Sequence, residues 1–241
     1  MPSSKLIVEN FEKLGILPHT KPNAIGMWPN EQECLVWTAL QCDPKKLWIE
    51  VGSFCGGSAI LLGMAQNSLG GDGGVIAIDL AFNPMFDYNV KRSKLVNIQK
   101  TQDDSIKYLN QIIKPVSFLF LDGWHSFSSV VREFETIYPM LTHDTIIGFH
   151  DVSPNMLTHN QFHIQRNYEY VQQNLKLLLD EREQDFRLDE AVAYLCMEYG
   201  YEIIDIPVRK HIEHFQETGL KEWVRGTTSP HNSFTAIRKK V

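Results

Sequence analysis

The sequence predicts an α/β fold: a doubly wound, mostly parallel sheet of seven strands with a helical insertion between the fifth and sixth strands. Three observations predict it. Short apolar runs alternate along the chain with segments of helical periodicity, and the first run ends in a glycine-rich turn. After residue 150 the alternation gives way to a polar loop and two helical stretches before the last strands. Alternating strands and helices favour a parallel sheet with helices on both faces.

Each element can be placed by its pattern. The apolar runs predict strands at Leu47–Val51, Val75–Asp79, Leu95–Gln99, Val116–Asp122, Thr145–His150, Tyr201–Pro207 and Ser233–Lys239. Apolar residues at helical spacing predict helices near Asn30 and at Ala59–Ser68, Ser105–Ile113, Ser126–Tyr138, His163–Glu181 and Asp189–Tyr199. The helices between the strands have ordinary core faces, whereas the last two form the insertion.

The composition limits the class of protein. A chain of 241 residues, 43% of them hydrophobic, is long enough for one α/β domain spanning 1–241, with a helical cap at 1–45 and the insertion at 152–200. The net charge is -6 and basic residues form no long run, which argues against a nucleic-acid partner. No apolar segment approaches the length of a membrane span, and the four cysteines lack disulfide or metal spacing. We therefore expect a cytoplasmic protein with a small-molecule partner and no contact with membranes.

The most informative segment is LWIEVGSFCGGS, residues 47–58. It predicts a buried strand, a tight turn and the start of a helix. Small residues at such a turn let backbone N–H groups face a ligand, and the helix N-terminus adds a partial positive charge, so the turn suits a carboxylate or phosphate. The dinucleotide-binding pattern Gly-x-Gly-x-x-Gly needs glycine where this chain has Phe54. That departure argues against a nucleotide-dependent dehydrogenase.

The same turn resembles the first motif of class I S-adenosylmethionine (SAM) dependent methyltransferases. The match is to the catechol O-methyltransferase-like pattern Glu-x-Gly-x-x-Cys-Gly-x-Ser, and it runs through Glu50, Gly52, Cys55, Gly56 and Ser58. The resemblance covers roughly residues 31–152 and implies a Rossmann-like methyltransferase fold with SAM as cofactor. The SAM-binding residues that it implies are Glu50, Gly52, Ser53, Phe54, Ser58, Asp79, Gln102, Asp103 and Asp122.

Acidic or imidazole groups follow the ends of four predicted strands, where ligands of open parallel sheets bind. Asp79 ends the second strand, and its two carboxylate oxygens can accept both hydroxyls of a ribose. The alternative is that Asp79 caps the segment Ala81–Asn83. Beyond the third strand, Gln102 or Asp103 is predicted to hydrogen-bond the adenine edge, while the residues after them cap the next helix.

A histidine lies three residues after the fourth strand's terminal aspartate. In the macrolide sugar O-methyltransferases and cephalosporin-type methyltransferases, which this part of the chain resembles most, an Asp-x-x-His spacing supplies the general base. Here the pair is Asp122 and His125, where catechol-type enzymes have lysine. A free imidazole titrates near neutrality, so His125 is the predicted catalytic base. Trp124 is predicted either to form an apolar wall beside the substrate or to pack in the core.

His150 and Asp151 follow the fifth strand, at the position where the resembled enzymes carry two adjacent metal ligands. The resemblance implies a metal site of Asp122, His150 and Asp151. Carboxylates suit magnesium, manganese or calcium, and an imidazole shifts the preference toward manganese or another transition metal. Magnesium is the first expectation. An alternative role for His150 is to hydrogen-bond Asp151 without binding the ion.

Together these features predict divalent-metal-dependent transfer of a methyl group from SAM to a hydroxyl oxygen of a small molecule. We expect a sugar, glycoside or natural product with a neighbouring oxygen, because a cation that binds both oxygens would lower the pKa of the hydroxyl. One alternative is an iron-dependent hydroxylase, since histidine and aspartate at one rim also form iron sites. Another is a catalytically silent SAM-binding protein.

Two further expectations concern residues 26–29 and the oligomeric state. Residues 26–29 are predicted either to cover the methionine arm of SAM or to staple the following helix to the domain. The resembled enzymes are commonly homo-oligomers, so the resemblance implies a homo-oligomer here.

Overall fold

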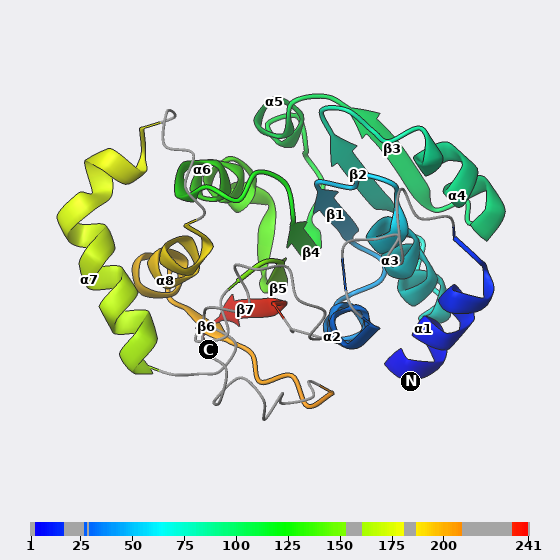
Figure 1. Ribbon diagram of the computed structural model, residues 1–241, viewed down its shortest axis with the longest axis horizontal. Coiled ribbons are helices and arrows are strands. Elements are labelled where there is room, and N and C mark those ends of the chain that lie inside the picture. The colour runs from blue at the N-terminus through cyan, green and yellow to red at the C-terminus, as the bar shows by residue number, and fades with distance from the viewer. Residues whose placement is uncertain are drawn as a thin grey trace, which may run out of the picture.

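The computed structural model describes residues 3–16, 27, 29–152, 161–180, 187–208 and 233–240. A seven-stranded sheet runs through the molecule in the order β3-β2-β1-β4-β5-β7-β6, with helices on both faces (Figure 1). The strands are β1 (Leu47–Val51), β2 (Val75–Asp79), β3 (Ile98–Gln102), β4 (Val116–Leu121), β5 (Leu141–Phe149), β6 (Tyr201–Ile203) and β7 (Thr235–Lys239). Strands β1 to β5 pair in parallel, and β7 runs antiparallel to β5 and β6. The predicted fold class is therefore confirmed.

The helices follow the strands in the expected alternation. They are α1 (Ser4–Lys13), α2 (Pro29–Ala39), α3 (Gly57–Ser68), α4 (Met85–Ser93), α5 (Ser105–Leu109), α6 (Phe127–Ile137), α7 (Gln161–Leu178) and α8 (Leu188–Glu198), with a short 3-10 helix at Tyr138–Met140. The insertion consists of α7 and α8, which pack against each other between β5 and β6.

The central strands are apolar on both faces because helices cover both. On one face, Trp48 of β1 packs edge-to-face on Phe118 of β4, among residues of α1, α2 and α3. On the other face, Ile49 belongs to a second cluster with Phe134 of α6 and Val192 of α8. Successive strand residues point to opposite faces, so a strand covered on both sides reads as a continuous apolar run.

One strand lies elsewhere than predicted, and one helix was not predicted at all. The third strand is Ile98–Gln102 and lies later in the chain than the predicted Leu95–Gln99. Among the described strands it pairs with β2 alone, at the edge of the sheet, and it is polar, whereas Val96 of the predicted range is 96% exposed. The sequence also gave no signal for α4, which buries only Phe86 and Asn89. Neither element has the covered apolar stripe on which periodicity depends.

Strand order reverses beside β1, whose neighbours are β2 on one side and β4 on the other. Gly52, directly after β1, has φ +86°, and a Cβ atom there would lie 2.1 Å from the carbonyl oxygen of Asp122. Only glycine permits this approach and this backbone conformation. The chain segments that leave β1 and β4 therefore contact each other directly, and they frame the site described below.

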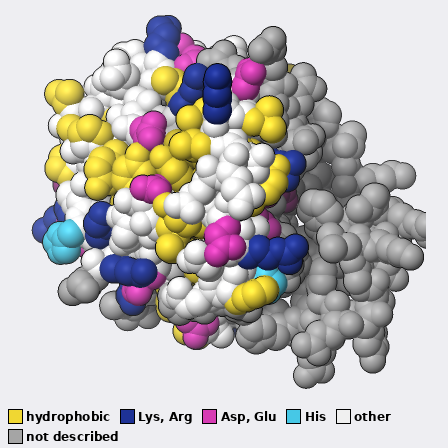
Figure 2. Space-filling model, turned by 90° about the vertical axis from the view of Figure 1, so that its left-hand side faces the viewer, with side chains coloured by type: hydrophobic (Ala, Val, Ile, Leu, Met, Phe, Trp, Pro, Cys, Tyr) yellow, Lys and Arg dark blue, Asp and Glu magenta, His cyan; other side chains and the backbone are white. Residues whose placement is uncertain are grey.

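Figure 2 shows the side of the molecule on which α7 lies, with hydrophobic side chains gathered among charged ones. Exposed apolar residues on α7 include Phe162 and Leu177. Among the residues that the structure describes, no helix has both the length and the apolar character needed to cross a membrane.

Candidate active site

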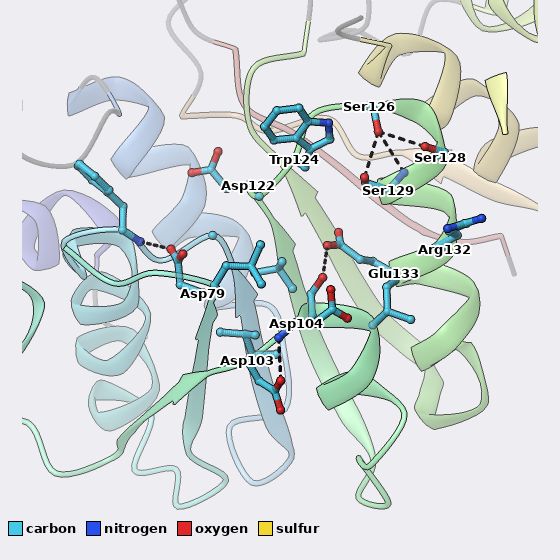
Figure 3. Close-up of a pocket in the computed structure, with 18 residues that line it drawn as sticks. Asp79, Asp103, Asp104, Asp122, Trp124, Ser126, Ser128, Ser129, Arg132 and Glu133 are labelled. Carbon is cyan, nitrogen blue, oxygen red and sulfur yellow. Dashed lines mark hydrogen bonds between the residues drawn. The ribbon is translucent and has the colours of Figure 1, made fainter. Parts of the chain in front are cut away.

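A cavity of about 610 Å³ opens beyond the carboxyl ends of the strands around the reversal point (Figure 3). Its walls come from the ends of β1, β2 and β4, from the start of α5 and from the first turns of α6. Open parallel sheets bind ligands at this position, and the volume lies within the usual range for small-molecule sites. Five of the predicted cofactor-binding residues line it: Gly52, Phe54, Asp79, Asp103 and Asp122.

Glu50 lies behind the glycine turn and is fully buried. Its Oε2 accepts a hydrogen bond from Ser53 Oγ at 2.5 Å, and Ser58 also hydrogen-bonds the carboxyl group. Its Oε1 has no hydrogen-bond partner among the described residues. Burial raises the pKa of Glu50 to about 8. Ser53 and Ser58 thus hold Glu50 and do not line the cavity, and the unpartnered oxygen fits a donor supplied by a ligand or water.

Asp79 ends β2 on the cavity wall, as Figure 3 shows. Its Oδ2 accepts the Phe54 N–H at 2.8 Å, and its Oδ1 accepts the Ala81 N–H at 3.0 Å. Asp79 therefore does cap the segment that begins at Ala81, as one of its two predicted roles required. Each carboxylate oxygen has a second lone pair, so Asp79 can also accept hydroxyl groups of a ligand.

The turn between β3 and α5 forms another part of the wall. Asp103 lines it and forms an ion pair with Lys107 at 2.8 Å, and the hydrogen bond from Lys107 lowers the pKa of Asp103. Asp104 caps α5 by accepting the Lys107 N–H, as expected. Gln102, by contrast, is exposed at the end of β3 and is not part of the cavity wall.

Sequence reasoning missed a pair deeper in the same wall. Ser105 Oγ donates to Glu133 Oε1 at 2.6 Å, and burial raises the pKa of Glu133 to about 7. The available signal was a glutamate on the buried face of α6, beside Phe134.

Trp124 also lines the cavity and is 63% exposed, so the prediction that it packs in the core is wrong.

At the ends of β4 and β5, two carboxylates and two imidazoles meet. His125 Nε2 lies 3.3 Å from Asp122 Oδ1, and His125 Nδ1 lies 3.5 Å from Asp151 Oδ2. His150 Nδ1 lies 3.1 Å from Asp122 Oδ1 and 3.5 Å from Asp151 Oδ1. Residues that the sequence places apart are thus brought together as predicted. We call these four residues the Asp–His cluster.

Within the Asp–His cluster, Asp122 and His150 each shift the pKa of the other toward its charged form. Burial alone would lower the pKa of His150, but Asp122, Glu31 and Asp151 outweigh it and hold that pKa well above its ordinary value. Burial would raise the pKa of Asp122, yet the two histidines bring it below its ordinary value. Sequence reasoning missed Glu31 of α2, whose Oε2 lies 3.4 Å from His150 Nε2.

The donors of the Asp–His cluster fit a divalent cation by their chemistry, because carboxylate oxygens and an imidazole nitrogen are common ligands. In this structure, however, the side chains contact one another and are not spaced around a common point. Asp122, His150 and Asp151 contact one another at hydrogen-bond or ion-pair distances. Within the described ranges, no three His, Cys, Asp or Glu side chains are arranged to hold a metal ion.

The seven-stranded sheet and the cavity at its strand ends have the architecture of the Rossmann-like methyltransferase fold. Residues 49–152 match the sequence model of a family described as a methyltransferase domain. This matched segment runs from β1 to just after Asp151 of the Asp–His cluster. No curated protein sequence matches the chain.

Solved structures agree on the fold. A methyltransferase of Podospora anserina with bound S-adenosylhomocysteine (SAH) has a TM-score of 0.56 at 14% identity, covering 100% of this chain and 89% of that one. The O-methyltransferase TomG of Streptomyces achromogenes, in complex with SAM, has a TM-score of 0.54 at 12% identity, covering 100% and 91%. A putative O-methyltransferase of Klebsiella pneumoniae has a TM-score of 0.53 at 11% identity, covering 100% and 91%. The finer resemblance to macrolide sugar and cephalosporin-type enzymes stays a prediction.

Proposed function

We propose that the protein is a SAM-dependent O-methyltransferase acting on a hydroxyl group of a small molecule. The observation that carries the proposal is the cavity at the strand reversal, lined by Asp79 at the end of β2 and Asp122 at the end of β4. His125 is not in the cavity wall, but its Nε2 lies 3.3 Å from Asp122 Oδ1. The unpartnered oxygen of Glu50 beside the glycine turn adds support. The similar O-methyltransferase of Streptomyces achromogenes was solved with SAM.

Each residue then has a definite task. Asp79 accepts the ribose hydroxyls while its bond from Phe54 N fixes the turn, and Asp103 faces the adenine end. Trp124 forms an apolar wall beside the acceptor. SAM, when bound, supplies a methyl group on a positively charged sulfur. Because methyl transfer is an in-line displacement, the protein's main contribution is to align the acceptor oxygen with that methyl group.

Proton removal falls to His125. Asp122 Oδ1 accepts the Nε2–H of the ring at 3.3 Å, which leaves Nδ1 to take the proton of the acceptor hydroxyl. Asp151 Oδ2, 3.5 Å from Nδ1, stabilises the imidazolium that forms. Imidazole is the side chain that most often serves as a general base near neutral pH.

We also propose that Asp122, Asp151 and His150 hold a divalent cation, magnesium or manganese. When bound, such an ion would make the hydroxyl more acidic. The proposal rests on the donor chemistry and on the convergence of the side chains at the ends of β4 and β5. We further propose that the acceptor is a sugar, glycoside or natural product with a neighbouring oxygen, since two adjacent oxygens suit such an ion.

Two measurements test these proposals. In calorimetry, SAM and SAH should bind, whereas binding of 2-oxoglutarate without SAM binding would overturn the methyltransferase proposal and favour a hydroxylase. In the second measurement, transfer of a labelled methyl group to a panel of glycosides and catechols is followed with and without EDTA. Transfer that EDTA abolishes and manganese restores supports the cation; full activity in EDTA contradicts it.

A further inference from the structure

Glu31 is a buried acidic residue outside the segment that matches the methyltransferase family. It lies in the first turn of α2, is 1% exposed and contacts residues more than a hundred positions away. Its Oε2 is 3.4 Å from His150 Nε2. Its Oε1 accepts the Ser233 N–H at 2.6 Å and lies 2.7 Å from Ser233 Oγ. One carboxylate thus joins α2, the end of β5 and the segment before β7.

Burying a carboxylate costs free energy unless the carboxylate has hydrogen-bond or charged partners. The contacts of Glu31 with His150 and Ser233 supply such partners. The two far contacts are divided between its oxygens, one for the imidazole and one for Ser233. Glu31 therefore acts on two elements at once.

The ring of His150 lies between Glu31 on one side and Asp122 and Asp151 on the other. With Nε2–H donated to Glu31, Nδ1 faces Asp122 at 3.1 Å and Asp151 at 3.5 Å. Histidines at functional sites are commonly oriented by a carboxylate on the nitrogen that points away from the site. Ser233 Oγ also lies 3.4 Å from Asp151 Oδ1, so the same carboxylate helps to place Asp151.

We propose that Glu31 is a positioning residue of the active site: it fixes the ring of His150 with Nδ1 toward Asp122 and Asp151, and it ties the start of the last strand to the same cluster. Neither Glu31 nor Ser233 lies within the matched residues 49–152. The orientation stands on geometry alone, and its effect on cation binding and turnover rests on the proposed function.

Nuclear magnetic resonance at one fixed pH tests the orientation without any substrate. The wild-type protein should show a downfield, slowly exchanging Nε2–H signal, assigned to His150 by its disappearance in His150→Gln. Glu31→Gln should lose or strongly shift it. Ser233→Ala should keep it, because this change spares the contact between Glu31 and His150. Absence of the signal in the wild type, where folding is not at issue, overturns the proposal, and so does an unchanged signal in Glu31→Gln.

Manganese titration of the cofactor-free protein supplies the second readout. Loss of a carboxylate that orients a ligand typically weakens metal binding roughly 10- to 100-fold, and that is the expectation for Glu31→Gln. SAM affinity should be nearly unchanged. Glu33→Gln is the matched control, since Glu33 lies on the same helix and accepts from Ser4 Oγ instead. If Glu31→Gln binds manganese as tightly as the wild type, the positioning role is wrong.

The two proposals can fail separately. If the wild type binds no manganese but shows the His150 signal with the expected response to Glu31→Gln, the cation proposal fails and the orientation by Glu31 stands. If manganese binds and activity is found while the signal is absent, the proposed function stands and the positioning role of Glu31 is overturned.

Discussion

Nδ1 of His150 lies 3.1 Å from Oδ1 of Asp122, although 28 residues separate the two in the chain. Strand register produces this contact. Leu121 at the end of β4 pairs with Phe149 at the end of β5, so the residue after each strand emerges at the same edge of the sheet. The parallel pairing of two buried strands therefore assembles the polar centre of the site.

His125→Ala should lower the turnover number roughly 10²- to 10⁴-fold, the usual contribution of a general base. SAM affinity should be nearly unchanged, because His125 contacts Asp122 and Asp151 and is assigned in our proposal to the acceptor and not to the cofactor. Steady-state kinetics and calorimetry measure the two effects. His143→Ala is the control, since His143 is almost fully exposed on β5. Full activity in His125→Ala would show that another group removes the proton.

Asp79→Asn should weaken SAM binding roughly 10- to 100-fold, because hydrogen bonds to a charged acceptor contribute about 1.5–3 kcal/mol. The substitution keeps the size of the side chain but removes the carboxylate that accepts the Phe54 N–H and that we propose accepts the ribose hydroxyls. Calorimetry with SAH provides the measurement. Asp87→Asn is the control and should leave the affinity unchanged. Asp87 is an exposed residue of α4 that forms an ion pair with Lys100. Equal affinities in all three proteins would remove Asp79 from the cofactor site.

Gly52→Ala should lower the free energy of unfolding by about 3 kcal/mol or more, because it combines a left-handed backbone with a clash against Asp122. Gly70→Ala separates the two causes. Gly70 has φ +68° with no atom within 4 Å of an added Cβ, so it should lose only about 1–2 kcal/mol. Urea denaturation compares the two variants. Similar losses at both positions would mean that β1 and β4 can move apart at little cost.

Glu133 should make the stability of the ligand-free protein depend on pH. Burial raises its folded-state pKa to about 7 from an ordinary value of 4.5, so the folded protein holds this proton more tightly than the unfolded chain. Its stabilising contribution is complete below about pH 4.5 and is lost as the pH rises through about 7.

Glu133→Gln should therefore gain stability relative to the wild type between pH 5 and pH 8, by roughly 3 kcal/mol at most. Denaturation curves at several pH values provide the measurement. Glu135→Gln, at an exposed position on the same helix, should follow the wild type. If the difference between wild type and Glu133→Gln does not change with pH, Glu133 does not titrate in this range.

The sequence was informative wherever burial constrains it. Strands β1 and β4 are covered on both faces, so all but one residue of each is apolar and their positions were predictable. The glycine turn was equally clear, because Gly52 must accommodate the backbone of Asp122. The positions of edge strand β3 and helix α4 were not predictable. Both elements are largely exposed to solvent, so polar residues are tolerated and no hydrophobic periodicity marks them.

By itself, the chain determined the α/β class, the turn after β1 and the acidic or imidazole groups at the strand ends, because these features depend on local backbone geometry and on short spacings. Only the tertiary structure decided which of those groups touch. Whether His125 lies between Asp122 and Asp151, and whether Glu31 reaches His150, depends on strand register and on how α2 packs. Such contacts join residues up to 202 positions apart, and no local pattern encodes a distance of that kind.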